Sequence, residues 1–313
     1  MKKTFPMPTN YFAIPLGLSA VALAWFHAGH FWQGGETVGD IIGVAAVAVW
    51  LLFIGLFSYK VFAYFEQVKE EWQCPVRFSF LALIPITTML VGDLLYHWQI
   101  NRLGETLVWL GVVSQLAYAC LRIGSLWRGD TFKEESVQPP FYLPSVASNF
   151  TSASSLALLG YNDLAYLFLG AGMIAWIMFE PILLQRLRVA PIADPAKATL
   201  GIILAPAFVG VSAYLSVNGG QVDIFAKFLW GYGFLQLLFL ARMLPWIVKN
   251  GFPLGLWAFS FGLASMANSA VAFYAGTQLG GLAIGAFIFA NLMILLLVFN
   301  TLYKLFKGQF WLK

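Results

Sequence analysis

Charged residues and cysteines are scarce in this sequence, and each shortage excludes a class of protein. Lys, Arg, Asp and Glu make up 10% of the 313 residues, whereas 60% are hydrophobic, and the mean hydropathy is +0.78. A water-soluble domain does not bury so much apolar surface, so a lipid bilayer must solvate the chain. Two cysteines, Cys74 and Cys120, are too few for a disulfide framework.

Motifs for chemistry are equally scarce. No zinc-protease, serine-hydrolase, P-loop or dinucleotide-binding motif occurs in a suitable context. The three histidines and two cysteines do not stand at metal-ligand spacing. We therefore predict that the chain is not an enzyme and holds no metal or other cofactor.

The positively charged residues of the chain raise two alternatives, a nucleic-acid partner and a cleavable signal peptide. A net charge of +4 would suit a nucleic-acid partner, but Lys and Arg are scattered over short connections, so we expect no nucleic acid. Lys2 and Lys3 precede an apolar stretch, as in a cleavable signal peptide. Because this stretch continues past His27 without a small-residue cleavage site, we interpret it as a first spanning helix.

Apolar runs long enough to cross a hydrocarbon core of about 30 Å recur along the chain. We predict an all-α integral membrane protein with one transmembrane domain over residues 1–313. Ten spans are expected, near 12–31, 38–64, 76–97, 103–126, 144–160, 163–187, 196–217, 222–248, 253–275 and 280–306. The fifth is rich in Ser, Thr and Asn, so we expect other helices to shield it from lipid.

The connections between these spans alternate in character. Those after the odd-numbered spans are short and contain Gly, Asn or Gln, which suits tight hairpins. Of the 18 Lys and Arg residues, 16 lie at the termini or in the other connections, and Arg102 and Lys227 alone fall on the hairpin side. The positive-inside rule then predicts that both termini are cytoplasmic.

Odd-numbered and even-numbered spans also differ in side chains. Odd spans are rich in small and hydroxyl residues, and three contain a proline that should bend the helix, namely Pro15, Pro85 and Pro206. Even spans are bulkier and suit a lipid-facing layer. Five hairpins of this kind can close into a quasi-fivefold ring in which the odd helices line a pore. An ordinary bundle with small residues buried for packing remains the alternative.

Several long strings resemble a known family. They are the residues from Pro75 to Phe80, from Ile84 to Asp93, from Asn149 to Ser155 and from Gly255 to Ala264. They are similar to the tellurite-resistance and dicarboxylate transporter family, which includes the plant guard-cell slow anion channels. The strings are spread over most of the chain.

The resemblance implies an anion channel of the bacterial inner membrane, associated with tellurite resistance and assembled as a homotrimer. It also implies that a phenylalanine of the ninth helix plugs the pore, and the matching position is Phe261. One departure is Ala13, where the family often has glycine, and its methyl group would narrow the pore mouth.

The predicted inner helices offer further pore-lining candidates. They are hydroxyl residues and aromatic residues of the odd spans: Ser19, Thr88, Ser152 and Ser265, with Phe12, Phe150 and Phe208. Packing within the protein is the competing role for the three aromatic residues. Because these helices carry almost no Lys or Arg, we expect weak binding that favours large, poorly hydrated anions.

Some ionisable residues lie within or beside the spans. Asp93 and Glu180 fall inside predicted helices, where carboxylates are expensive and often functional. His27 and His30 lie near the predicted outer mouth and are candidates for pH sensing or for plain surface residues. Small inorganic or organic anions and the bilayer are thus the expected partners. A proton-coupled carrier for tellurite or C4-dicarboxylates is the main alternative, and a non-conducting scaffold is a third.

Overall fold

The computed structural model describes residues 4–129 and 136–311, and the regular structure within these ranges is entirely helical. Nine helical segments in these ranges are long and apolar enough to cross a membrane. They are Thr9–Gly29, Gly35–Ala63, Arg77–His97, Asn101–Arg128, Asn162–Val189, Asp194–Val217, Ile224–Ile247, Leu254–Gly276 and Gly280–Phe306. Each overlaps one predicted span closely, so these nine helices lie where hydropathy predicts them.

The fifth predicted span, 144–160, differs from the other nine. It consists of the π-helical η6 (Leu143–Ala147) and the 11-residue α6 (Ser148–Leu158). Thr151, Ser152 and Ser155 of α6 are completely buried. The described residues therefore give nine candidate spans, and the prediction of ten is not confirmed, because this segment is shorter and more polar than the rest.

Burial separates these segments into two groups. Four segments have 72–89% of their most apolar stretch buried inside the protein, and they are Thr9–Gly29, Arg77–His97, Asp194–Val217 and Leu254–Gly276. In the other five, the share is 22–33%. We call the first group, together with 143–158, the inner segments, and the second group the outer helices. A mostly exposed apolar helix suits contact with lipid.

Each inner segment changes its helical form along its length. A 3-10 or π-helical portion comes first and an α-helix follows. The pairs are η1 (Thr9–Phe12) with α1 (Ala13–Gly29), η2 (Arg77–Ala82) with α4 (Leu83–His97), η5 (Pro139–Tyr142) and η6 with α6, η7 (Asp194–Leu204) with α8 (Ala205–Val217), and η8 (Leu254–Phe259) with α10 (Ser260–Gly276). A 3-10 helix is narrower and rises more steeply than an α-helix.

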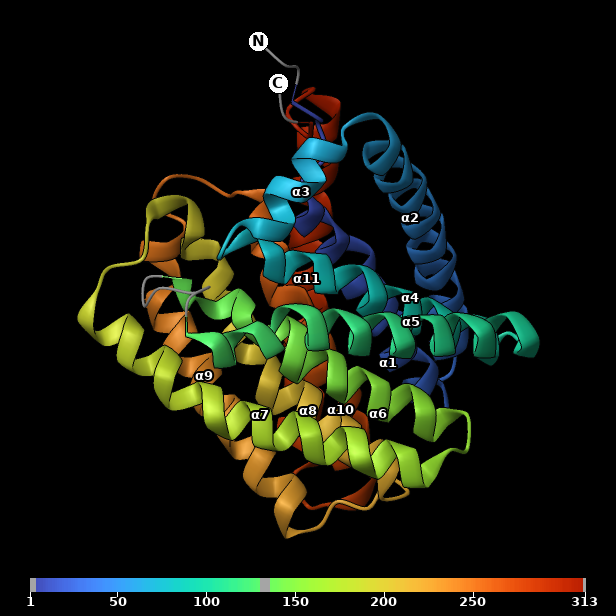
Figure 1. Cartoon of the computed structure of the whole chain (residues 1–313). Helices are drawn as coiled ribbons and strands as arrows, with labels where there is room; N and C mark the ends of the chain where they lie inside the picture. The colour runs from blue at the N-terminus through green and yellow to red at the C-terminus, as the bar shows by residue number, and fades with distance from the viewer. Residues whose placement is uncertain (1–3, 130–135, 312–313) are drawn as a thin grey trace.

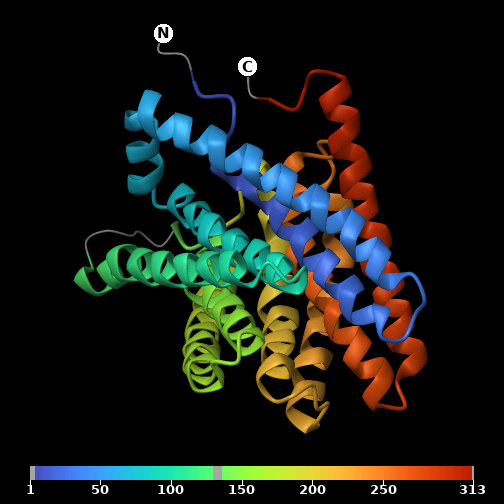
Figure 2. The same cartoon turned by 90° about the vertical axis from the view of Figure 1, so that its right-hand side faces the viewer.

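The outer helices each contact the inner helix that precedes them in the chain. They are α2 (Gly35–Ala63), α5 (Asn101–Arg122, followed by η3, Gly124–Arg128), α7 (Asn162–Val189), α9 (Ile224–Ile247) and α11 (Gly280–Phe306). The inner helices also contact one another, α1 with α4, α4 with α6, α6 with α8, α8 with α10, and α10 with α1. Figure 2 shows α2 covering α1 from the outside.

Both ends of the described chain lie at the same end of the molecule (Figures 1 and 2). There the Tyr11 hydroxyl donates a hydrogen bond of 2.6 Å to the Phe310 carbonyl oxygen. A helix that the sequence did not predict, α3 (Phe65–Gln73), lies at this end. Its Glu71 accepts hydrogen bonds of 2.7 Å from Lys60 Nζ of α2 and from Thr9 Oγ1 of η1. The buried Lys60 charge is thereby paired within the protein.

Large side chains of four inner helices lie against glycines of the outer helices. A Cβ atom added at the glycine would lie within 2.8 Å of the inner side chain in each case. The pairs are Phe26 with Gly39, Met89 with Gly111, Phe150 with Gly172 and Phe208 with Gly233. Glycine is required here for close approach, and it lets the inner and outer helices pack tightly against each other.

Gly172 offers a test of this packing, because α7 also carries Gly170. A Cβ atom at Gly172 would lie 2.7 Å from the completely buried ring of Phe150, whereas nothing lies within 4 Å of one at Gly170. We expect Gly172→Ala to cost about 1–3 kcal/mol through overpacking, and Gly170→Ala to be neutral or to gain up to about 1 kcal/mol of helix propensity. Unfolding temperatures in detergent measure both. Equal effects of the two substitutions would contradict the close packing.

Candidate functional site

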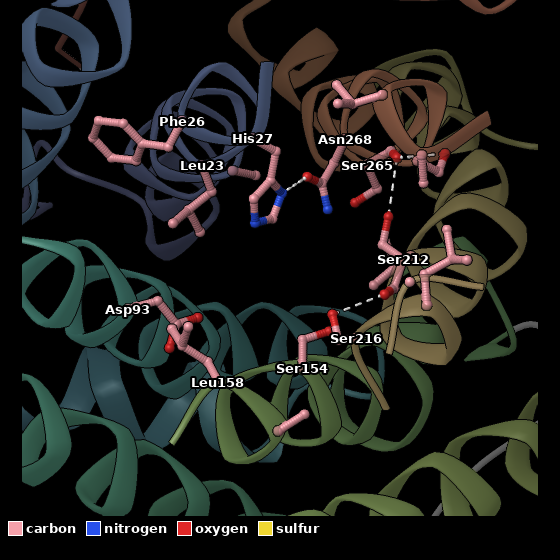
Figure 3. A pocket seen from close by; sticks show the side chains of 18 of the residues that line it. Leu23, Phe26, His27, Asp93, Ser154, Leu158, Ser212, Ser216, Ser265 and Asn268 are labelled. Atoms are coloured by element: carbon pink, nitrogen blue, oxygen red, sulfur yellow. Dashed lines mark hydrogen bonds between the residues drawn. The ribbon is translucent and has the colours of Figure 1, made fainter. Parts of the chain in front are cut away.

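A cavity of about 480 Å³, which we call the wide cavity, lies among the inner helices. Every inner α-helix contributes to its wall, with Leu23 from α1, Asp93 from α4, Ser154 from α6, Ser212 from α8 and Asn268 from α10 (Figure 3). The connection between α8 and α9 also lines it, so the cavity lies toward the end of the molecule away from the termini.

A second cavity, of about 60 Å³, lies on the side of the termini, and we call it the narrow cavity. Its wall again includes all five inner segments, mainly their 3-10 and π-helical portions. Asn10, Phe80, Leu143, Thr199 and Trp257 represent the five.

Phe261 lies between the two cavities. Among the described residues it is the one that lines both. It occupies the second position of α10, directly after the change from 3-10 to α-helix, and it is 7% exposed. The Phe261 ring therefore adds an apolar surface at the boundary between the two spaces.

Two of the predicted candidates, Phe261 and Ser265, are brought together in the wide cavity, one turn apart on α10. The Ser265 backbone carbonyl accepts hydrogen bonds from the hydroxyls of Ser212 (3.0 Å) and Ser269 (2.9 Å). Ala13 lines the narrow cavity, so its methyl group does lie beside that space.

The three other aromatic candidates do not line either cavity, because they point away from the centre. Phe12 packs edge-on against Phe53 of α2, with ring centroids 5.9 Å apart. Phe208 packs in the same way against Phe234 of α9 at 5.8 Å, and Phe150 lies against Gly172 of α7. All three are completely buried. For them the packing role, weighed from the sequence, fits their positions.

Three of the hydroxyl candidates also lie outside the cavities. Thr88 accepts a hydrogen bond of 3.3 Å from Trp50 Nε1 of α2 and donates to the Ile84 carbonyl. Ser152 lies between Met89 of α4 and Gln115 of α5. Ser19 is completely buried, and its hydroxyl has no hydrogen-bond partner within the described residues. Residue type alone did not reveal which face of each helix these side chains occupy.

The three predicted kink prolines lie at equivalent places. Pro15 and Pro85 are the third residues of α1 and α4, and Pro206 is the second residue of α8. Each thus stands where a 3-10 portion gives way to an α-helix. Proline is tolerated in the first turn of an α-helix, where its missing N–H costs little.

Hydroxyl groups that the sequence analysis did not single out form much of the polar wall. Ser154 donates to the Phe150 carbonyl at 3.2 Å, and Ser216 donates to the Ser212 carbonyl at 2.9 Å. These protons therefore go to the helix backbone, and the oxygen lone pairs face the cavity. Four-residue spacing of serines, as in Ser212 and Ser216, was the signal that would have found this face.

Titratable groups are gathered in the wide cavity. Asp93 is 3% exposed, and its Oδ2 accepts a hydrogen bond of 2.7 Å from the Ser155 hydroxyl. His27, His30 and His97 line the same space. Neither Lys nor Arg lines either cavity among the described residues, so strong cationic anion binding is not built into these walls.

Glu180, the other carboxylate noted from the sequence, does not line the cavities. It accepts hydrogen bonds from Trp176 Nε1 (2.8 Å), Tyr232 Oη (2.5 Å), Gln236 Nε2 (3.1 Å) and the Tyr142 hydroxyl. These donors come from η5, α7 and α9, so the carboxylate ties three elements together. A partly buried carboxylate with so many donors suits a structural role.

Comparison with known proteins agrees with this architecture. The family described as voltage-dependent anion channel matches residues 6–303 of the chain. The tellurite resistance protein TehA homolog of Haemophilus influenzae is 61% identical over 311 residues, which cover 99% of this chain and 94% of that protein.

Two plant proteins are more distant relatives. The S-type anion channel SLAH1 of Arabidopsis thaliana is 25% identical over 314 residues, covering 91% of this chain and 80% of that protein. The S-type anion channel SLAH2 of the same plant is 24% identical over 288 residues, and the match spans 54% of its length. The resemblance noted in the sequence is thus confirmed, and the chain belongs to the voltage-dependent anion channel family, which consists of channels and transporters and not of enzymes.

Proposed function

We propose that this protein is an anion channel in which the five inner segments surround a pathway and Phe261 closes it. The observation that carries the proposal is the position of Phe261, which lines both the wide and the narrow cavity. The closed order of contacts among α1, α4, α6, α8 and α10 supports a ring of inner helices around this axis. An apolar constriction on such an axis stops ions by excluding water.

The chemistry of the walls supports passive flow over tight binding. Hydroxyl oxygens and apolar side chains predominate, and the described lining residues include no Lys or Arg. An anion that enters must lose part of its hydration shell without gaining a strong cationic partner. We infer that large, poorly hydrated anions pass more readily than small, strongly hydrated ones.

We also propose a membrane topology, a cellular membrane and an assembly for this protein. We infer one transmembrane domain of five hairpins, in which 143–158 serves as the tenth crossing, shielded by its neighbours. The basic connections favour cytoplasmic termini in a bacterial inner membrane. The relative named for tellurite resistance supports a role in that resistance, and a homotrimer is the assembly that the family resemblance implies.

Replacing Phe261 tests the pathway directly. We expect Phe261→Ala to raise chloride or nitrate conductance by about tenfold or more in planar bilayers, because it joins the two cavities by a wettable opening. Phe208→Leu is the control, since Phe208 is a buried inner-helix phenylalanine that packs away from the cavities. An unchanged current in well-folded Phe261→Ala protein would rule out the gate.

A proton-coupled carrier is the alternative that one observation favours. Asp93 is a buried carboxylate in the wide cavity, and its Oδ1 has no hydrogen-bond partner within the described residues. Intramembrane carboxylates of this kind serve as proton sites in carriers.

Proteoliposomes with opposed proton and anion gradients separate the two mechanisms. For the channel we expect currents of Phe261→Ala protein to reverse at the Nernst potential of the anion, and Asp93→Asn to keep that reversal potential. Uptake of tellurite or succinate that follows the proton gradient, saturates, and disappears in Asp93→Asn would instead establish the carrier.

A further inference from the structure

All three histidines of the chain line the wide cavity, although they come from two helices. His27 and His30 lie at the end of α1, and His97 is the last residue of α4. The proposed passage of anions past Phe261 does not require them. Histidine is the side chain whose ordinary pKa lies closest to neutral pH. The presence of three histidines in one cavity therefore suggests a role that depends on pH.

His27 is held in a defined orientation. Its Nδ1 lies 2.5 Å from the Asn268 side-chain oxygen (Figure 3). Because an amide oxygen only accepts hydrogen bonds, Nδ1 carries the proton and donates it. In the neutral ring, Nε2 then bears a lone pair, and Figure 3 shows this nitrogen directed into the cavity.

Neutral His27 therefore repels an anion at Nε2, whereas protonated His27 attracts one. Protonation places an N–H donor and a positive charge at the cavity wall. The Asn268 amide nitrogen lies beside it on the cavity side (Figure 3) and supplies a second donor. The hydroxyls of Ser212 and Ser216 donate their protons to helix carbonyls and do not offer them to this anion.

The charged groups around His27 favour one class of ligand. On α4, Asp93 and His97 face the same cavity, with the His97 ring stacked on Phe26 at 3.8 Å. On α2, Glu36 lies against Gly29. The described α10 carries no charged residue.

Two further groups complete this environment. His30 follows α1 and lines the cavity, and Asp40 of α2 accepts a hydrogen bond of 2.7 Å from Trp98. One protonated histidine supplies a single positive charge, which a monovalent anion balances.

We propose that the wide cavity holds a proton-dependent site for one small monovalent anion, bound by Nε2–H of protonated His27 and the amide of Asn268. This site adds a binding step to the proposed channel. It rests on the proposed function in one respect, namely that anions pass through the wide cavity. Binding of the anion and protonation of His27 reinforce each other by linkage.

Binding to the closed protein tests the site without any need for conduction. Nitrate is titrated into detergent-purified protein at pH 8 and pH 5, with calorimetry as the readout. We expect the apparent dissociation constant to be at least about fivefold lower at pH 5, because a histidine gains its proton over this range. His27→Gln should remove the pH dependence, whereas His97→Gln, which changes another histidine of the cavity, should keep it.

Three results would overturn the proposal. They are pH-independent nitrate binding, a pH dependence that survives in folded His27→Gln protein, and a pH dependence that Asp93→Asn abolishes while His27→Gln does not. The Phe261→Ala current is measured separately. If Phe261→Ala protein carries no current but nitrate binding depends on His27, the channel is rejected and the site is kept. If Phe261→Ala protein conducts but nitrate binding does not depend on His27, the site is rejected and the channel is kept.

Discussion

The outward packing of large inner side chains determines the rest of this structure. Phe26, Met89, Phe150 and Phe208 each lie against a glycine of the neighbouring outer helix. Within lipid, helices gain no hydrophobic free energy from association, so close contact of this kind is a main source of their cohesion. Met89, Phe150 and Phe208 line neither cavity, whereas serines of α6, α8 and α10 line the wide one. The cavities are the space that results.

Phe261 is the exception to this arrangement. Its ring lies between two cavities instead of against an outer glycine. Among the described residues, neither Lys nor Arg lines the cavities on its two sides. In the proposed channel, such an apolar barrier acts on water and ions together, and small changes in its position have large effects on both.

The sequence predicted the spans well and the faces of the helices poorly. Nine apolar helices and the two-layer division followed from hydropathy and from the contrast between odd and even spans. The rotation of each inner helix did not, because it is surrounded by protein and is apolar on most sides. Ser265 and Ser152 look alike in the sequence, yet Ser265 lines the wide cavity and Ser152 packs between Met89 and Gln115.

Two local features escaped the sequence for other reasons. The helix α3 is short and polar, and the tertiary contacts of Glu71 with Lys60 and Thr9 hold it in place. Asn268 is a single amide among small residues, and its role depends on its contact with His27, which is 241 positions away in the chain. Neither relation is encoded in local spacing. Phe261, by contrast, was identified through the family resemblance and not through its own pattern.

The change from a 3-10 portion to an α-helix, found in four of the five inner segments, has a mechanical consequence. A 3-10 helix turns by about 120° per residue and an α-helix by about 100°. Moving the junction between η8 and α10 by one residue would therefore twist all that follows by about 20° and alter the segment length by about 0.5 Å. Phe261 is the second residue after that junction. A change in the length of η8, on the side of the molecule where the termini lie, would therefore rotate the Phe261 ring about the helix axis.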